Sequence, residues 1–176
     1  MWIAIYPGHV GKDSGAIDAS AAGDDLYTLE CQINGQVASK VFLLCTLLGW
    51  KPIIALGDFD ARIKATSQCD IGVSIHADAC TNQSVRGFHA MYCTGSTAGE
   101  SIAKLIDESL RVIIPRARSA HARSDLIILK RTTFPVVLVE CGFLTNDGDE
   151  KLLHSEFHQY HLAWGIVEGL RRWVGA

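Results

Sequence analysis

Short apolar runs alternate along the chain with longer segments in which apolar residues recur every three or four positions. The first pattern predicts strands, and the second predicts amphipathic helices. Gly49 follows the first helical segment, in a position that glycine favours at helix ends. Strands that alternate with helices indicate an α/β fold with a largely parallel sheet. The predicted strands are 2–6, 51–56, 71–76, 87–93, 126–129 and 136–140, the predicted helices are 26–48, 61–68, 97–112 and 148–174, and the predicted long loops are 17–25 and 114–124.

Composition narrows the class of protein. The chain has 176 residues, of which 48% are hydrophobic and 20% charged, and it shows no repeat or linker, so we expect a single domain over residues 1–176. A net charge of −3 gives no positive field to hold nucleic acid. No apolar run reaches the roughly 18 residues that span a bilayer, so we expect no membrane insertion. The N-terminus lacks the pattern of a signal peptide, which predicts a protein that is cytoplasmic as made.

The cysteines are irregularly spaced, and none forms a C-x-x-C pair. In a chain without a signal peptide, an even number of cysteines is poor support for disulfides. Most of them stand among apolar neighbours, which favours small buried hydrophobes over disulfide or metal roles. The six are Cys31, Cys45, Cys69, Cys80, Cys93 and Cys141.

Polar residues of catalytic type follow several predicted strands, and in parallel sheets such strand ends gather functional groups. His9 follows the first strand, His76 ends the third and Glu140 ends the last, while Glu30 lies in the long helix. Two histidines and a carboxylate suit zinc, and a further carboxylate could act as a general base. A lone histidine at a strand end is more often a hydrogen-bonded structural residue. A carboxylate that ends an apolar strand is harder to explain structurally, because an unpaired buried charge is costly.

A rival histidine cluster lies on the last predicted helix. His154, His158 and His161 share one helix face, but the order H-E-x-x-H is missing. We therefore favour a solvated helix face over adventitious metal binding. The opposite stripe is apolar and is predicted to pack inward; it consists of Leu153, Phe157, Tyr160, Trp164 and Val167.

Four segments of the chain, in this order, carry a family likeness. They are I-Y-P-G-H at 5–9 with G-A at 15–16, then Glu30, then S-I-H-A-D-A at 74–79 with G-F at 87–88, and finally L-I-I-L at 126–129 through L-V-E-C-G-F-L-T-N at 138–146. With these motifs the chain resembles the zinc-dependent N-acetylmuramoyl-L-alanine amidases of the type-3 amidase family, which cut bacterial peptidoglycan. Tyr6 and Val10 depart from the family pattern, and the departures suggest a phage or prophage branch of endolysin-like enzymes.

The resemblance implies a fold, a site and a reaction. The fold would be a six-stranded, mostly parallel mixed sheet flanked by helices, of the zinc-amidase/exopeptidase kind, with one Zn²⁺ at the carboxyl edge. The reaction would be hydrolysis of the amide between N-acetylmuramic acid and L-alanine in peptidoglycan. The ligands would be His9, Glu30 and His76, the catalytic residue Glu140, and the expected substrate contacts Asp13, Ser14, Gly142 and Phe143.

Two other functions stay open at this point. The same ligand set could serve a zinc peptidase acting on stem-peptide bonds, and the same fold could serve as a non-catalytic wall-binding module. We expect a monomer with peptidoglycan as its substrate, without the appended wall-binding domain common in lytic enzymes. An enzyme without a signal peptide would reach the wall after release, for which a phage holin is one hypothesis.

Overall fold

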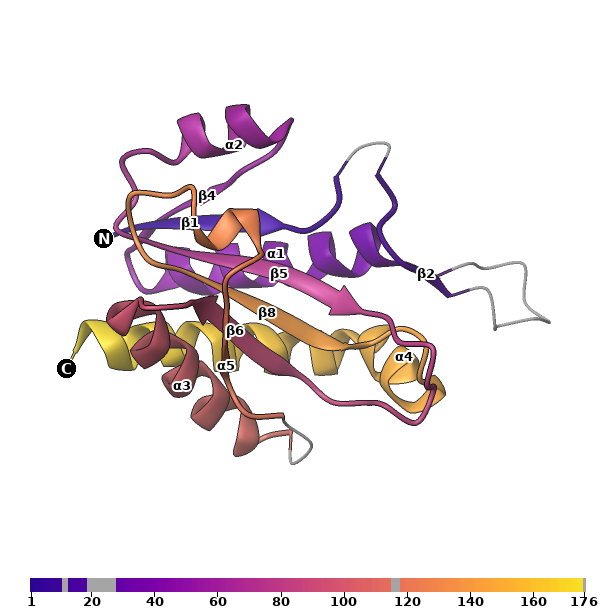
Figure 1. Ribbon diagram of the computed structural model, residues 1–176. Coiled ribbons are helices and arrows are strands. Elements are labelled where there is room, and N and C mark those ends of the chain that lie inside the picture. The colour runs from indigo at the N-terminus through magenta and orange to yellow at the C-terminus, as the bar shows by residue number, and fades with distance from the viewer. Residues whose placement is uncertain (11–12, 19–27, 115–117, 176) are drawn as a thin grey trace.

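A six-stranded sheet runs through the centre of the computed structural model, which describes residues 1–10, 13–18, 28–114 and 118–175 (Figure 1). Neighbouring strands are parallel, except that β8 and β6 are antiparallel, so the predicted mostly parallel mixed sheet is confirmed. Beside it lies a two-stranded antiparallel sheet of β2 (Ile17–Asp18) and β3 (Thr28–Leu29). The order of the large sheet is β4 (Lys51–Ile54), β1 (Trp2–Pro7), β5 (Ile71–Asp78), β8 (Val136–Phe143), β6 (His89–Cys93) and β7 (His121–Arg123).

Helices cover the two faces of this sheet unequally. The long helices α1 (Glu30–Leu47), α3 (Thr97–Arg111) and α5 (Glu156–Val174) lie along one face, as Figure 1 shows. On the other face lie the short helix α2 (Phe59–Ala65) and the 3₁₀-helix η1 (Ile127–Leu129). Because both faces are covered, the central strands are apolar on both sides.

The register of three neighbouring strands places polar residues side by side. His76 on β5 lies opposite Glu140 on β8, and Glu140 lies opposite His89 on β6. Paired residues in a sheet point to the same face, so these three side chains share the face of the two short helices. This register is what assembles the candidate site.

Two predicted elements are wrong near the ends of the sheet. The apolar residues at 126–129 form η1 instead of a strand: Leu129 is buried, whereas Ile127 is 54% exposed. The sixth strand is β7, which lies within the predicted loop 114–124. Its three residues include no buried side chain, so it has no apolar pattern that could have predicted it.

Three predicted helices differ by more than one residue in their limits, and the one expected over 61–68 is α2, Phe59–Ala65. The helix expected over 26–48 begins at Glu30, because Thr28 and Leu29 pair with β2; residues 26 and 27 lie outside the described residues. The helix expected over 148–174 is two helices, α4 (Asp147–Leu153) and α5. The Ser155 hydroxyl accepts the N–H of His158 and so starts a new helix there.

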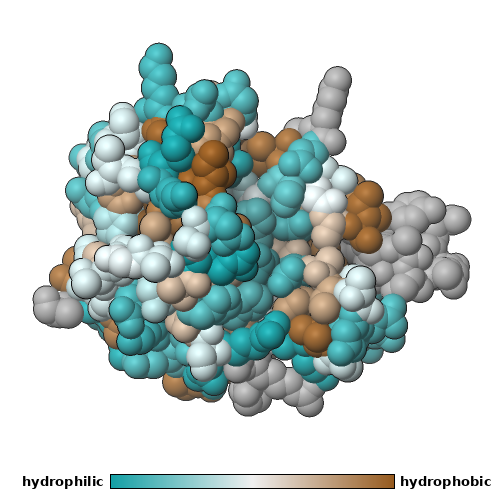
Figure 2. Space-filling model, viewed as in Figure 1, coloured by the Kyte–Doolittle hydropathy of each residue, from teal (hydrophilic) through white to brown (hydrophobic). Residues whose placement is uncertain are grey.

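The predicted inward stripe of the last helix is only partly correct: Leu153 and Val167 are buried, but its three aromatic residues are not. Phe157 is 73% exposed, and Tyr160 and Trp164 are also exposed. The buried face instead carries Ile166 and two glycines, and it packs on α3. A Cβ at Gly169 would lie 2.6 Å from the backbone of Ile106, so the helices meet along their least bulky side. Figure 2 shows the face seen in Figure 1, where hydrophilic residues surround small apolar groups.

Half of the cysteines are buried as predicted, and of the three histidines on the last helices His154 is exposed whereas His158 and His161 are half-buried. All six cysteines are free thiols, and Cys45, Cys69 and Cys141 are buried. Burial raises the pKa of Cys45 to about 12, which makes that thiol unreactive. The histidines of the last helices do not converge on a common point among the described residues. No helix in the described part of the chain is long and apolar enough to cross a membrane.

Candidate metal centre

The loop after β1 carries His9 in a strained backbone conformation. Its φ of 49° is left-handed, which non-glycine residues seldom adopt and which often marks functional sites. The His9 Nδ1 atom lies 2.9 Å from Asp13 Oδ2, and the other ring nitrogen, Nε2, lies 3.4 Å from Glu30 Oε2. Asp13 therefore orients the ring so that Nε2 faces Glu30.

Glu30 is the first residue of α1, where the helix dipole favours a carboxylate. It is buried and accepts hydrogen bonds from Asn34 Nδ2 at 3.1 Å and from the backbone N–H groups of Ala16 and Ala77 at 2.9 and 3.3 Å. Burial alone would raise the pKa of Glu30, but hydrogen bonds from His76, Ala16 and Asn34 outweigh it and hold the pKa below its usual value. The carboxylate is thus kept charged inside the protein.

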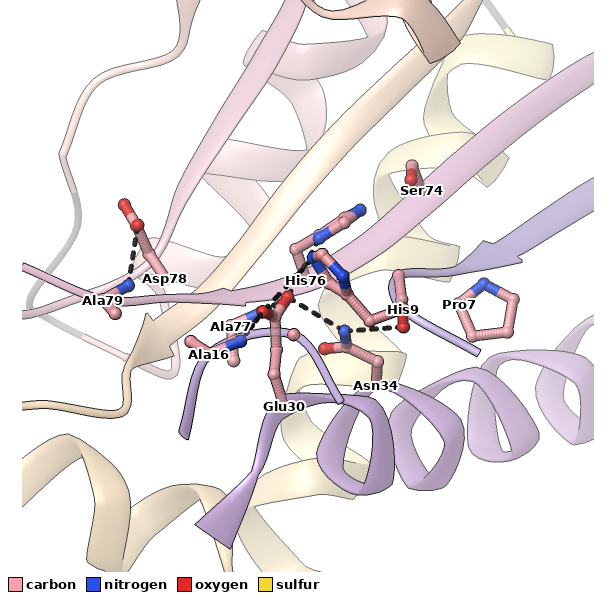
Figure 3. Close-up of polar contacts among 12 residues, drawn as sticks. Pro7, His9, Ala16, Glu30, Asn34, Ser74, His76, Ala77, Asp78 and Ala79 are labelled. Carbon is pink, nitrogen blue, oxygen red and sulfur yellow. Dashed lines mark hydrogen bonds and ion pairs between the residues drawn. The ribbon is translucent and has the colours of Figure 1, made fainter. Parts of the chain in front are cut away.

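His76 approaches Glu30 from the end of β5 (Figure 3). Its Nδ1 lies 3.0 Å from Glu30 Oε1, and its ring meets the ring of His9 edge-on, with centroids 5.3 Å apart. Gly8 makes this approach possible, because a Cβ there would collide with the His76 ring. Gly15 does the same on the other side, since a Cβ there would lie 2.5 Å from Glu30 Oε2.

One ligand atom from each of His9, Glu30 and His76 lies within 4.8 Å of the others. Within the described residues this is the only such group of three. Two imidazoles and one carboxylate form a donor set that suits zinc and leaves a position for water. The structure therefore brings the three predicted ligands together, and their chemistry fits one zinc ion.

Glu140 stands beside this cluster, opposite His76 in the register of β5 and β8. Its Oε2 is buried and has no hydrogen-bond partner among the described residues. Burial raises the pKa of Glu140 well above its usual value, and the negative charges of Asp78 and Glu30 raise it further, against a smaller effect of Arg123. Three carboxylates gathered in this way form a site that a cation would stabilise.

Two supporting side chains were not anticipated from the sequence. Asn34 is buried one helical turn after Glu30 and donates to both Glu30 Oε1 and the Gly8 carbonyl, each at 3.1 Å. His89 is buried next to Glu140, with its ring stacked on Phe143 at 5.9 Å and its Nδ1 without a described partner. The sequence signal for Asn34 was its position four residues after Glu30, which puts the two side chains on the same helix face. For His89 the only signal was a polar residue within a predicted strand.

The residues predicted as substrate contacts lie in different environments. Asp13 is exposed and holds His9, and the Ser14 hydroxyl donates to the Gly15 carbonyl at 3.4 Å. The Phe143 ring is buried, and its N–H donates to Asp149 Oδ2 at 3.1 Å, so that N–H has an internal partner. Contact with substrate stays a prediction for all four positions.

The family comparison accounts for these features together. Residues 3–172 match the family described as N-acetylmuramoyl-L-alanine amidase (Amidase_3). The chain belongs to that family, and the three converging ligand atoms of His9, Glu30 and His76 lie within the matched residues.

Individual relatives are similar over most of this chain, although several are much longer. The chain is 29% identical to the N-acetylmuramoyl-L-alanine amidase LytC of Bacillus subtilis, over 95% of this chain but only 34% of that protein. It is 27% identical to the germination-specific amidase of the same organism, over 97% of this chain and 78% of the relative. Among solved structures, the CwlD amidase of Clostridioides difficile, in complex with the GerS lipoprotein, is 26% identical, with a TM-score of 0.88 over 99% and 98% of the two chains.

Proposed function

We propose that the protein hydrolyses the amide bond between N-acetylmuramic acid and L-alanine in peptidoglycan, with one Zn²⁺ held by His9, Glu30 and His76. The observation that carries this proposal is the convergence of those three ligand atoms beside the unpartnered Oε2 of Glu140. Family membership over residues 3–172 supports the choice of bond. Because the chain spans only about a third of LytC, its own activity has to be tested directly.

Each side chain then has a task in the reaction. A bound zinc ion supplies a Lewis acid that polarises the amide carbonyl and makes a water more acidic. Glu140 accepts the proton of the attacking water at its unpartnered Oε2 and passes it to the departing alanine nitrogen.

The surrounding residues keep these groups in place. Asp13 fixes His9 through Nδ1, so Nε2 remains the ligand atom. Asn34 ties Glu30 to the backbone at Gly8, which links two of the ligand-bearing segments. Such supporting hydrogen bonds typically change metal affinity or activity about 10- to 100-fold when they are removed.

The test is digestion of purified cell walls by the protein with and without a chelator, followed by zinc re-addition. The expected products are new L-alanine amino termini and intact glycan strands, formed only when zinc is present. New amino termini at other stem-peptide residues would instead indicate a peptidase, and unchanged walls would indicate a non-catalytic module. Phage origin and release by lysis stay predictions. Finding the protein outside intact, non-lysing cells would contradict release by lysis.

A further inference from the structure

A cavity of about 350 Å³ opens beside the metal centre, on the side of β1 and α2. His9 and His76 line it at the metal centre, and Phe59, Arg62 and Ile127 line it elsewhere. In Figure 2 this face of the molecule is hollowed, and both hydrophilic and apolar residues border the hollow. A sphere of this volume is about 9 Å across, and two extended residues span about 7 Å. The cavity therefore has room for the two peptide residues that follow a bond held at the metal centre.

Arg62 is the cation of this cavity, and it has no carboxylate partner among the described residues. Its Nη2 donates to the Pro7 carbonyl at 2.6 Å, and its Nε is buried without a partner. Its guanidinium lies 5.6 Å from the centre of the Tyr6 ring. An arginine keeps its charge even when partly buried, so its remaining donors favour an anion.

The acidic residues near Arg62 are occupied by other groups. Asp58 accepts the N–H of Ala61 and caps α2, while Asp60 pairs with Arg131 at 3.3 Å. Asp13 also lines the cavity, but its two oxygens are taken by His9 and by the N–H of Gly15. The charge of Arg62 is thus available to a ligand that enters the cavity.

We propose that Arg62 binds the free α-carboxylate of the second stem-peptide residue, a glutamate that continues the peptide through its γ-carboxyl group. This inference rests on the proposed function, since it places the scissile amide at the metal centre. That carboxylate is the first anion on the peptide side of the scissile bond, about two residues away. The uncharged sugars on the other side offer no such group. The stem peptide would therefore lie over β1 and α2, with the glycan on the opposite side of the metal centre.

A matched pair of ligands tests the assignment without requiring turnover. One is the tripeptide L-Ala–γ-D-Glu–L-Lys, and the other is the same peptide with the α-carboxylate converted to a carboxamide. Calorimetry with the zinc-loaded wild type should show about tenfold tighter binding of the carboxylate form, as expected for a charge-assisted hydrogen bond. Arg62→Gln should remove this preference, and Arg62→Lys should retain part of it.

Lys64 provides the matched control, because it is an exposed cation on the same helix. Lys64→Gln should leave the tenfold preference unchanged. In turnover of muramoyl peptides, Arg62→Gln should raise KM for the carboxylate substrate while leaving kcat and the carboxamide substrate nearly unaffected. The unfolding midpoint and the zinc content of each variant show whether the fold and the metal centre are kept.

Two results would overturn the assignment. One is equal binding of the two tripeptides by the wild type. The other is an equal loss for both ligands in Arg62→Gln with reduced zinc content, which would mean that Arg62 only holds Pro7 in place. Tight, Arg62-dependent binding of the carboxylate tripeptide by a protein that leaves walls uncut would uphold the subsite and refute the proposed reaction.

Discussion

Glycines bring groups into close contact in two regions of this protein, and the groups differ in kind. At the carboxyl edge of the sheet, Gly8 and Gly15 leave room for His76 and Glu30. Between α3 and α5, a Cβ at Gly169 would lie 2.6 Å from the Ile106 backbone. The first region positions polar groups and adds little apolar burial. The second joins two apolar helix faces into the core.

Because of this difference, changes at the sheet edge should mainly affect activity, and changes between α3 and α5 should mainly affect stability. Side chains at the sheet edge are held by hydrogen bonds in one arrangement, so a small displacement disturbs chemistry more than folding. The α3–α5 contact is close-packed and apolar, so an added methyl group disturbs folding more than chemistry. Substitutions in the two regions should therefore have opposite profiles.

Among the substitutions that compare the two regions, the largest effect is expected for Gly8→Ala. The new methyl group would force the His76 ring out of the ligand cluster, and a displacement of about 1 Å can cost roughly 100-fold in rate. The ring can rotate away, so the unfolding midpoint should change little. Zinc content by elemental analysis and kcat/KM on cell walls check this. A variant with full zinc content and normal turnover would show that the edge is not tightly constrained.

The next-largest effect is expected in how stability depends on pH, to which His89 contributes. Burial, together with smaller effects of the positive charges of His121, Arg118 and Arg123, lowers the pKa of His89 to about 4. Because the folded-state pKa lies below the ordinary 6.5, neutral His89 supports folding above pH 6.5, and this support is lost as the pH falls toward 4. The loss amounts to about 3 kcal/mol.

Urea unfolding of the wild type and of His89→Gln at several pH values measures this contribution. Asp78 Oδ2, which lies 4.0 Å from His89 Nε2, and Glu140 titrate in both proteins, so their effects largely cancel in the difference. The variant should lose less stability between pH 6.5 and 4 than the wild type. Parallel pH profiles for the two proteins would contradict a neutral, buried His89.

A smaller effect is expected for Gly169→Ala in the helix contact. Overpacking against Ile106 should lower the free energy of unfolding by about 1–3 kcal/mol, while kcat/KM of the folded protein stays near that of the wild type. Gly35→Ala on α1 is the control, because nothing lies within 4 Å of the added Cβ. It should stabilise the helix by about 0.5–1 kcal/mol. Denaturant unfolding measures the stability of both variants. A large activity loss in Gly169→Ala would show that the two regions do not differ in the way described.

The sequence predicted the chemistry of the site better than its surroundings. His9, His76 and Glu140 were identifiable because polar residues at the ends of apolar strands are unusual and because their motifs resemble a known family. The elements η1 and β7 were predicted wrongly for a local reason: a short apolar run fits a strand or a buried turn, and three residues without a buried side chain carry no apolar pattern.

Other features depend on contacts that are remote in sequence. Arg62 lines the cavity because its helix folds back to Pro7, and no local pattern indicates that its charge lacks a partner. The exposure of Phe157 and Trp164 likewise follows from the glycine face of α5, which meets α3 more closely than an aromatic face could. Local hydrophobicity favoured the aromatic face, and tertiary packing favoured the other one.

The central claim is that His9, Glu30 and His76 hold the metal while Glu140 moves the proton. The most direct measurement is the zinc content and the wall-hydrolysis rate of Glu140→Gln, side by side with the wild type. The account predicts one zinc per chain in both proteins and a turnover reduced by about 10³-fold in the variant, in line with the loss of a general acid–base group. Turnover within tenfold of the wild type, at full zinc content, would contradict it.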